Sequence, residues 1–274
     1  MDISSWARLL LESPELSDKL TDLKPSASLL EWASYSLPDS PARSGKIQFS
    51  SERVKFPGLN KIKTPEGRSI AVHSFANHEL LAIEMMAAAI LIYPHDLNDP
   101  ASIRLKKGLV STIRDEQKHL KLYLSRLKDD GVEFGDYPLN DFFWRQMPKL
   151  TSMDSFLALM SMTFESANLD FALQYQQVFK EAGDPKTAEI LRIVYEDELT
   201  HVAFGAHWMN QWKQDKTLWE YYTSILPYPL TPARAKGPVF AEHSRIEAGI
   251  DQDWIDNLKN YHDDYRITTR RSWK

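Results

Sequence analysis

The sequence contains no cysteine, and this absence narrows the metal chemistry open to it. A chain without thiols forms no disulfide, no iron–sulfur cluster and no thiolate-bound zinc or haem site. Any metal ion must therefore be held by oxygen and nitrogen atoms. Glycine is also scarce, with ten residues among 274. No glycine-rich phosphate loop, nucleotide fingerprint or Ser/His/Asp catalytic order stands out.

Long hydrophobic runs and an excess of positive charge are absent as well. The longest apolar run, Met85–Tyr93, is far shorter than the ~20 residues of a membrane-spanning helix. The net charge is −5, so the chain lacks the basic footprint of a nucleic-acid-binding protein. The N-terminal residues lack the basic and apolar segments of a signal peptide. We expect a cytoplasmic protein that binds neither nucleic acid nor a membrane.

Four long helices are predicted from the residues at their ends. Three begin with a capping residue followed by proline, at Thr64-Pro65, Asp99-Pro100 and Asp184-Pro185. The predicted helices span residues 64–93, 99–130, 151–182 and 184–212. Residues 132–150 form a long aromatic and proline-rich connection between the second and third helices. This order predicts an all-α protein built on a four-helix bundle with one long crossover.

Segments before and after the bundle complete the predicted organisation. We expect an N-terminal arm over residues 1–63, the bundle over 64–215 and a C-terminal extension over 216–274 that packs on it. The arm contains an apolar pattern that predicts one amphipathic helix over residues 6–20. In the extension, a short helix is expected over residues 252–261.

A repeated motif is the most informative feature of the chain. Asp115–His119 follows the pattern Asp-Glu-x-x-His, and Asp197–His201 repeats it. Residues three apart lie on the same face of a helix, so each motif directs a carboxylate and an imidazole the same way. One copy is weak evidence, but two copies on the second and fourth predicted helices favour a shared site. The alternative is that both are ordinary charge pairs on solvated helix faces.

The first predicted helix offers two carboxylates on different faces. Glu79 shares a stripe with apolar residues such as Phe75 and Ile83, which predicts an interior position. Because a buried, unpartnered carboxylate is costly, a metal ion is the expected partner. Glu84 lies on the other side with His73 and Asn77. It is either an outer-sphere group or a polar-face residue, and His73 is expected to make a structural hydrogen bond.

On the third predicted helix the candidate is Glu165. Its helical neighbours Met162, Leu169, Ala172 and Leu173 are apolar, which predicts that its carboxylate also points inward. The alternative is a mid-helix Glu that faces solvent.

Together these residues define a candidate two-metal site with approximate two-fold repetition. The predicted ligands are Glu79, Glu116, His119, Glu165, Glu198 and His201. Four carboxylates and two imidazoles suit two iron ions, or alternatively manganese or a mixed manganese–iron pair. Asp115 and Asp197 are predicted to accept hydrogen bonds from the imidazole N–H groups of the ligands, and Glu84 is a further candidate for such a supporting position.

The segments that carry these residues resemble a known family. Thr64–Arg68, Glu79–Glu84, Gly131–Asp136 and the two repeated motifs are similar to the ferritin-like superfamily, and more closely to uncharacterised bacterial proteins catalogued as domain of unknown function 455. The resemblance covers about residues 60 to 250. It implies a ferritin-like dimetal bundle and brings no established reaction with it. The family's pattern often has a His where this chain has Asn77.

Three functions are compatible with this reading of the sequence. The leading one is an O₂-dependent oxidoreductase that acts on a small organic substrate, with the extensions walling a pocket. The second is a non-catalytic role in metal oxidation, storage or scavenging, and the third is a helical binding module without metal. The extensions could equally form contacts in a homodimer. The substrate and the electron donor are not specified by the sequence.

Overall fold

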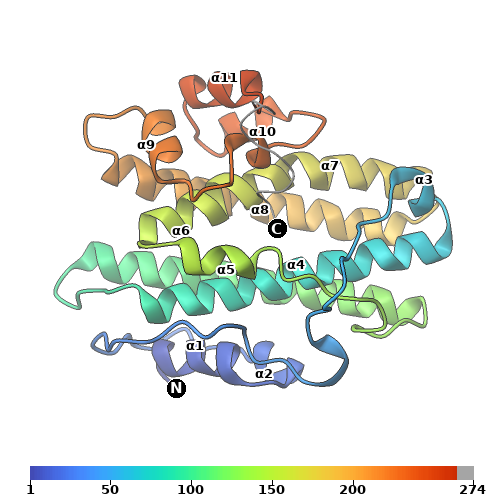
Figure 1. Ribbon diagram of the computed structural model, residues 1–274, viewed down its shortest axis with the longest axis horizontal. Coiled ribbons are helices and arrows are strands. Elements are labelled where there is room, and N and C mark those ends of the chain that lie inside the picture. The colour runs from blue at the N-terminus through green and yellow to red at the C-terminus, as the bar shows by residue number, and fades with distance from the viewer. Residues whose placement is uncertain (264–274) are drawn as a thin grey trace. The chain divides into compact units, whose positions relative to one another are not determined.

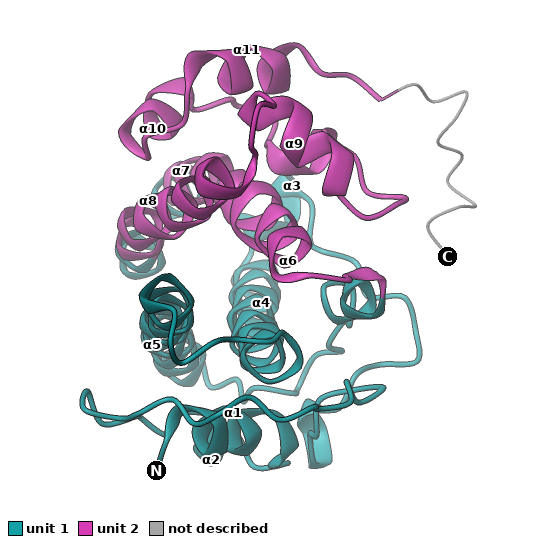
Figure 2. Cartoon of the chain, turned by 90° about the vertical axis from the view of Figure 1, so that its left-hand side faces the viewer, with its two compact units in different colours: residues 1–148, 178–190 teal, residues 149–177, 191–274 magenta. Residues whose placement is uncertain are grey.

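A computed structural model describes residues 1–263 of the chain (Figure 1). Within these residues the protein forms eleven α-helices and no strand, so the predicted all-α class is confirmed. The chain divides into two compact units, one of residues 1–148 and 178–190, the other of residues 149–177 and those from Leu191 onward (Figure 2). The predicted division at residues 63 and 215 stays a prediction, and residues 264–274 of the predicted extension lie outside the described residues.

Unit 1 is built on two long antiparallel helices, α4 and α5, which follow one another in the sequence. Its helices are α1 Ile3–Glu12, α2 Leu16–Lys19, α3 Leu59–Ile62, α4 Pro65–Ile92 and α5 Pro100–Asp129. Helices α4 and α5 lie side by side, and α1 packs against α4 (Figure 1). The last residues of α7 and the first of α8 also belong to this unit.

The ends of α4 and α5 lie where local capping chemistry predicts them. Thr64 accepts a hydrogen bond from the Gly67 amide at 3.1 Å, and Pro65 occupies the first helical turn. Asp99 accepts from the amides of residues 101 and 102 at 3.0 Å each. After α5 the chain turns at Gly131, whose φ of +70° is readily adopted only by glycine. Both predicted helices are confirmed to within one or two residues.

Helix α4 is the core element of unit 1. It has the length and hydropathy of a membrane-crossing helix, yet 83% of its 18-residue apolar stretch is buried inside the protein. Burial on all sides explains why it shows no polar face. Its C-terminal carbonyls receive the ammonium of Lys106 on α5, which donates to Ala89, Ile90 and Tyr93 at 3.1, 2.9 and 2.7 Å. A cation at this end complements the helix dipole and fixes α5 to α4.

The N-terminal arm differs from the prediction of one helix over residues 6–20. It forms α1 and α2, separated at Ser13 and Pro14. Proline lacks an amide hydrogen and forces the preceding residue into an extended conformation, and Ser13 has φ −75° and ψ 132°. The amphipathic pattern itself is confirmed, because Trp6 and Leu10 are fully buried on one face of α1.

The long connection after α5 is anchored to α4 through His73. The amide of Gly135 donates to His73 Nε2 at 2.8 Å, which is the structural hydrogen bond expected of this histidine. The rings of Phe134 and Tyr137 lie 5.1 and 5.4 Å from the imidazole. At Gly135 the φ is +100°, and a Cβ there would lie 2.6 Å from Lys46 Cβ, so this close approach requires glycine.

Unit 2 contains the remaining helices and its own hydrophobic core. Its elements are α6 Met153–Leu159, the π-helical segment η3 Met160–Glu165, α9 Leu218–Ile225, the 3₁₀ turn η4 Pro232–Ala235, α10 Glu242–Glu247 and α11 Gln252–Asn260, with the greater parts of α7 Ser166–Glu181 and α8 Pro185–Trp212. The core joins residues of η3 and α8, such as Met162 and Val202, to Tyr222 on α9 and Trp254 on α11. The C-terminal extension thus shares one core with the helices it covers. The predicted helix over residues 252–261 is confirmed as α11.

The third predicted helix is not uniformly α-helical. The chain passes without a break from α6 through the π-helical η3 into α7. Thr163 Oγ1 donates to the Ala158 carbonyl, five residues earlier, at 2.7 Å, and accepts from Tyr222 OH at 2.8 Å. A π-helical turn inserts one residue into the α-helical register, so residues on either side change face. The predicted apolar stripe is confirmed at Leu169 and Ala172, which are buried, and is wrong at Leu173, which is 37% exposed.

Acid should destabilise the protein through His73. Burial lowers the pKa of His73 to about 4, although the nearby Asp136 partly counters the effect. Because the unfolded chain binds more protons than the folded chain between about pH 4 and the ordinary histidine pKa of 6.5, the free energy of unfolding falls as pH decreases through this window. Above this window the full stability is retained. His73→Gln keeps a side-chain acceptor for Gly135 but does not titrate. Urea unfolding from pH 7 to pH 4 should show a loss smaller by about 2–3 kcal/mol in this variant.

The control for this measurement is His243→Gln. The side chain of His243 is 88% exposed, so this variant should show the pH dependence of the parent protein. Equal pH dependence in His73→Gln and the parent would contradict the prediction.

Candidate metal centre

The first set of candidate ligands lies in unit 1, on α4 and α5. His119 Nδ1 lies 3.3 Å from Glu116 Oε2 on its own helix and 3.7 Å from Glu79 Oε2 on α4. Ligand atoms of all three residues fall within 4.8 Å of one another, and all three side chains are buried. The motif Glu-x-x-His on one helix and the single Glu on its neighbour are therefore brought together, as the sequence predicts.

The electrostatics of this set favour a cation. Burial and the neighbouring Glu116 carboxylate raise the pKa of Glu79 well above its usual value, while His119 opposes the shift. Two carboxylates held together away from water cannot both ionise at low cost. A divalent cation among them would restore the ionised form and supply the missing positive charge. The set of two carboxylate oxygens and one imidazole nitrogen is chemically suited to iron or manganese.

The second set lies in unit 2 and repeats the first. His201 Nδ1 lies 3.6 Å from Glu198 Oε2 on α8. A carboxylate oxygen of Glu165 and a ring nitrogen of His201 lie within 4.8 Å of each other, and both side chains are buried. In both motifs it is Nδ1 that faces the carboxylate three residues earlier. The alternative of two solvated charge pairs is wrong for both motifs, since Glu116, His119, Glu198 and His201 are at most 2% exposed.

Close packing of α8 against η3 brings Glu165 and His201 together. Gly205 lies one turn after His201, and Ser161 lies one turn before Glu165. A Cβ built on Gly205 would fall 2.3 Å from the Ser161 Cβ, so the two elements approach at a distance that only glycine permits. Glu165 itself is the last residue of the π-helical segment and is 2% exposed. Its predicted inward position is confirmed, and π-helical turns are frequent at functional sites.

One residue of this set is missing from the sequence prediction. Asn168 Nδ2 donates to Glu198 Oε1 at 2.9 Å, across from α7 to α8. Such a hydrogen bond orients the Glu198 carboxylate and leaves Oε2 directed toward His201. A signal was present in the sequence, because Glu165-x-x-Asn168 has the spacing of the Glu-x-x-His motifs.

The predicted outer residues have different surroundings. Glu84 is fully buried and forms ion pairs with Arg43 and Lys19 at 2.6 and 2.9 Å, so it does not lie on a solvated polar face. Asp115 is partly exposed, with Lys118 Nζ at 3.7 Å. Asp197 is also partly exposed. The hydrogen bonds from the imidazoles to Asp115 and Asp197 stay a prediction.

Substitution of Gly205 tests how this part of the site is built. An Ala in a helix is normally more stable than Gly by about 1 kcal/mol. Here the added methyl group meets Ser161, so Gly205→Ala should destabilise the protein by about 1–3 kcal/mol in urea unfolding. In a Ser161→Gly background the same change should cost less or become stabilising, because the clashing atom is gone. Equal effects of Gly205→Ala in both backgrounds would contradict the close approach.

Comparisons with known proteins identify a family but no activity. The model of the family described as protein of unknown function (DUF455) matches residues 12–256. An uncharacterized protein of Haemophilus influenzae is 26% identical over 211 residues, which is 72% of this chain and 72% of that protein. No solved structure matches the chain. The matched region includes both sets of candidate ligands, and the chain belongs to the DUF455 family of proteins of unknown function.

Proposed function

We propose that this protein is a dimetal carboxylate protein with a ferritin-like four-helix bundle. The bundle helices are α4, α5, the continuous run of α6, η3 and α7, and α8. In this proposal two metal ions are held jointly by both ligand sets, namely Glu79, Glu116 and His119 from unit 1, and Glu165, Glu198 and His201 from unit 2. The joining of the two sets is inferred from the repeated motif and from the ligand pattern of such bundles.

The observation that carries the proposal is the buried cluster of Glu79, Glu116 and His119. Its ligand atoms lie within 4.8 Å of one another, and the pKa of Glu79 is raised by burial and by Glu116. A cluster of this kind is expensive in an apolar interior unless a cation occupies it. Unit 2 supports the proposal independently, since Glu165 and His201 also offer close, buried ligand atoms.

Iron is the metal that this donor set favours, with manganese or a mixed pair as the alternative. Carboxylate oxygens and imidazole nitrogens suit both ions, and the chain has no thiolate that would select zinc or copper. When bound, a pair of such ions supplies redox chemistry and open coordination positions for O₂. We therefore propose an O₂-dependent oxidoreductase that acts on a small organic substrate.

The chain's own residues would perform four tasks in such a protein. Each motif histidine and the nearby carboxylates would hold the ions, and Nδ1 is the ring nitrogen that faces those carboxylates. Asn168 orients Glu198 through its hydrogen bond to Oε1. Apolar neighbours on α4 such as Ile83 and Met86, both at most 1% exposed, exclude water from the carboxylates of unit 1. Asp115 and Asp197 would fix the imidazole tautomers by accepting from Nε2.

Metal analysis of anaerobically purified protein tests the proposal. We expect about two iron or manganese ions per chain, and a change in the optical and EPR spectra when O₂ is admitted. His119→Ala and His201→Ala each remove one nitrogen ligand and should reduce the content to about one ion or fewer. His207→Ala is the matched control, since His207 lies exposed on α8 six residues after His201. It should retain the parent's metal content.

Other outcomes of this experiment would exclude the proposal or redirect it. A parent protein that binds no transition metal under these conditions would exclude it. Assembly into a cage with many irons per chain, seen by size-exclusion chromatography, would instead identify a storage protein. Equal metal content in the His201→Ala and His207→Ala variants would remove unit 2 from the site.

A further inference from the structure

A buried arginine from the N-terminal arm holds α4 from one side. Arg43 Nη2 donates to Glu84 Oε2 at 2.6 Å and Nε to Glu84 Oε1 at 3.0 Å, while Nη1 donates to Asn77 Oδ1 at 3.0 Å. The guanidinium also lies 4.2 Å from the centre of the Phe49 ring. Both Arg43 and Glu84 are buried. One side chain therefore connects two positions of α4 that lie seven residues apart.

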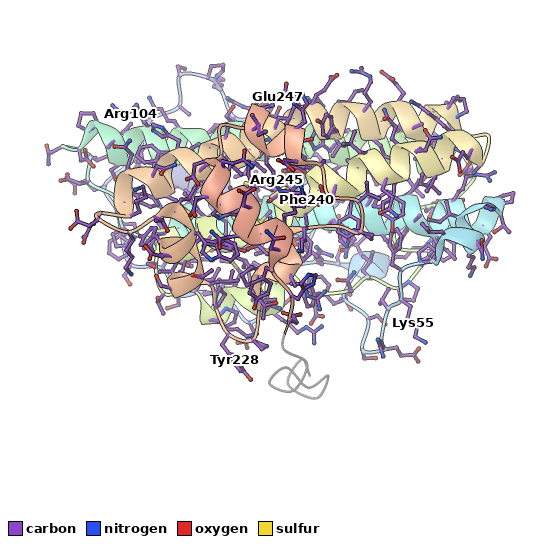
Figure 3. The ribbon with its side chains drawn as sticks, turned by 90° about the horizontal axis from the view of Figure 1, so that it is seen from above. Lys55, Arg104, Tyr228, Phe240, Arg245 and Glu247 are labelled. Carbon is purple, nitrogen blue, oxygen red and sulfur yellow. The ribbon has the colours of Figure 1, made fainter. Side chains whose placement is uncertain are left out.

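In unit 2, a buried arginine from the C-terminal extension binds a carboxylate of α7 in the same way. Arg245 Nη1 and Nη2 donate to the two carboxylate oxygens of Asp170 at 2.8 and 3.0 Å. Nη2 also donates to the carbonyls of Ser166 and Ala235 at 3.0 and 2.9 Å. The guanidinium of Arg245 lies 4.2 Å from the centre of the Phe240 ring (Figure 3). Arg245 and Phe240 both follow α9 in the sequence.

Asp170 receives further hydrogen bonds from the extension. The amides of Gly237 and Ala241 donate to its two oxygens at 2.8 and 2.7 Å. A Cβ on Gly237 would lie 2.8 Å from Asp170 Cβ, so this contact requires glycine. Tyr222 on α9 adds a hydrogen bond to Thr163 within the π-helical segment, at 2.8 Å. The extension therefore holds the helical run both before and after Glu165.

The two arginine pairs have the same position relative to the proposed ligands. Glu84 follows Glu79 by five residues, and Asp170 follows Glu165 by five. Five residues of α-helix correspond to a rotation of about 140° beyond one full turn. Each arginine therefore binds its helix on the side away from the proposed ligand. This shared placement is not explained by attachment of the extensions alone, which could occur at any buried position.

We propose that Arg43 and Arg245 are positioning residues of the metal centre, each of which fixes the rotation of the helix that carries a single glutamate ligand. The inference rests on the proposed function. A bidentate arginine–carboxylate pair has a narrow geometry, so it restricts how its helix can turn or slide. Metal ligands need placement to within about 0.5 Å. A buried ion pair adds little stability compared with apolar packing, which makes a geometric role the better account of its presence.

The test compares metal affinity with stability in Asp170→Asn. This change keeps the shape of the side chain but removes the charge that Arg245 binds. Titration of the full metal-free chain with Co²⁺, whose visible absorption reports ligand geometry, should give about tenfold weaker binding and an altered spectrum. Asp170→Glu restores the charge and should recover part of the affinity. The control is Glu242→Gln, which removes an exposed ion pair to Lys259 on the same extension and should bind like the parent.

Each outcome decides between the two proposals. If the parent binds Co²⁺ and folded Asp170→Asn binds it equally with the same spectrum, the positioning role is excluded and the metal centre stands. If the parent binds no Co²⁺, Fe²⁺ or Mn²⁺, the metal centre itself is excluded. If Asp170→Asn fails to fold, Arg245→Lys keeps the positive charge but removes the two parallel hydrogen bonds to Asp170. It should weaken binding about threefold, and unchanged binding would overturn the inference.

Discussion

The cost of keeping carboxylates away from water is the constraint on which both units depend. The first unit buries Glu79, Glu84, Glu116 and Asp184, and the second buries Glu165, Asp170 and Glu198. An ionised carboxylate in an apolar interior must be compensated by positive charge or hydrogen bonds. Arginines compensate Glu84 and Asp184 in the first unit and Asp170 in the second. The remaining buried carboxylates lie beside histidines, in sets that suit a cation. The carboxylates paired with arginine are therefore structural, and those beside histidine form the candidate site.

The terminal extensions follow from the same constraint. A core helix that carries a buried carboxylate on the side away from the candidate ligands needs a cover that brings an opposite charge. The arm supplies Arg43 and Lys19 to Glu84, and the extension supplies Arg245 and two backbone amides to Asp170. The extensions thereby become parts of the two cores. Their role in the structure is charge compensation and close packing.

Much of the fold and of the candidate site could be predicted because the signals are local. Helix ends at Thr64 and Asp99 depend on side chains that reach amides two or three residues away. The Glu-x-x-His motifs depend on helical periodicity, which places Glu116 beside His119 and Glu198 beside His201. The break at Pro14 is equally local, although the apolar pattern continues on both sides of it. The DUF455 resemblance is confirmed by the family match.

The helices, their ends and the residue types that could bind metal follow from the sequence alone. Only the tertiary structure decided which carboxylates are matched by arginine, because Arg43 lies 41 residues from Glu84 and Arg245 lies 75 residues from Asp170. The π-helical turn before Glu165 was also decided there, by packing of η3 against Gly205 and by the hydrogen bond from Tyr222. These interactions depend on long-range packing, and no periodic pattern of neighbouring residues encodes them.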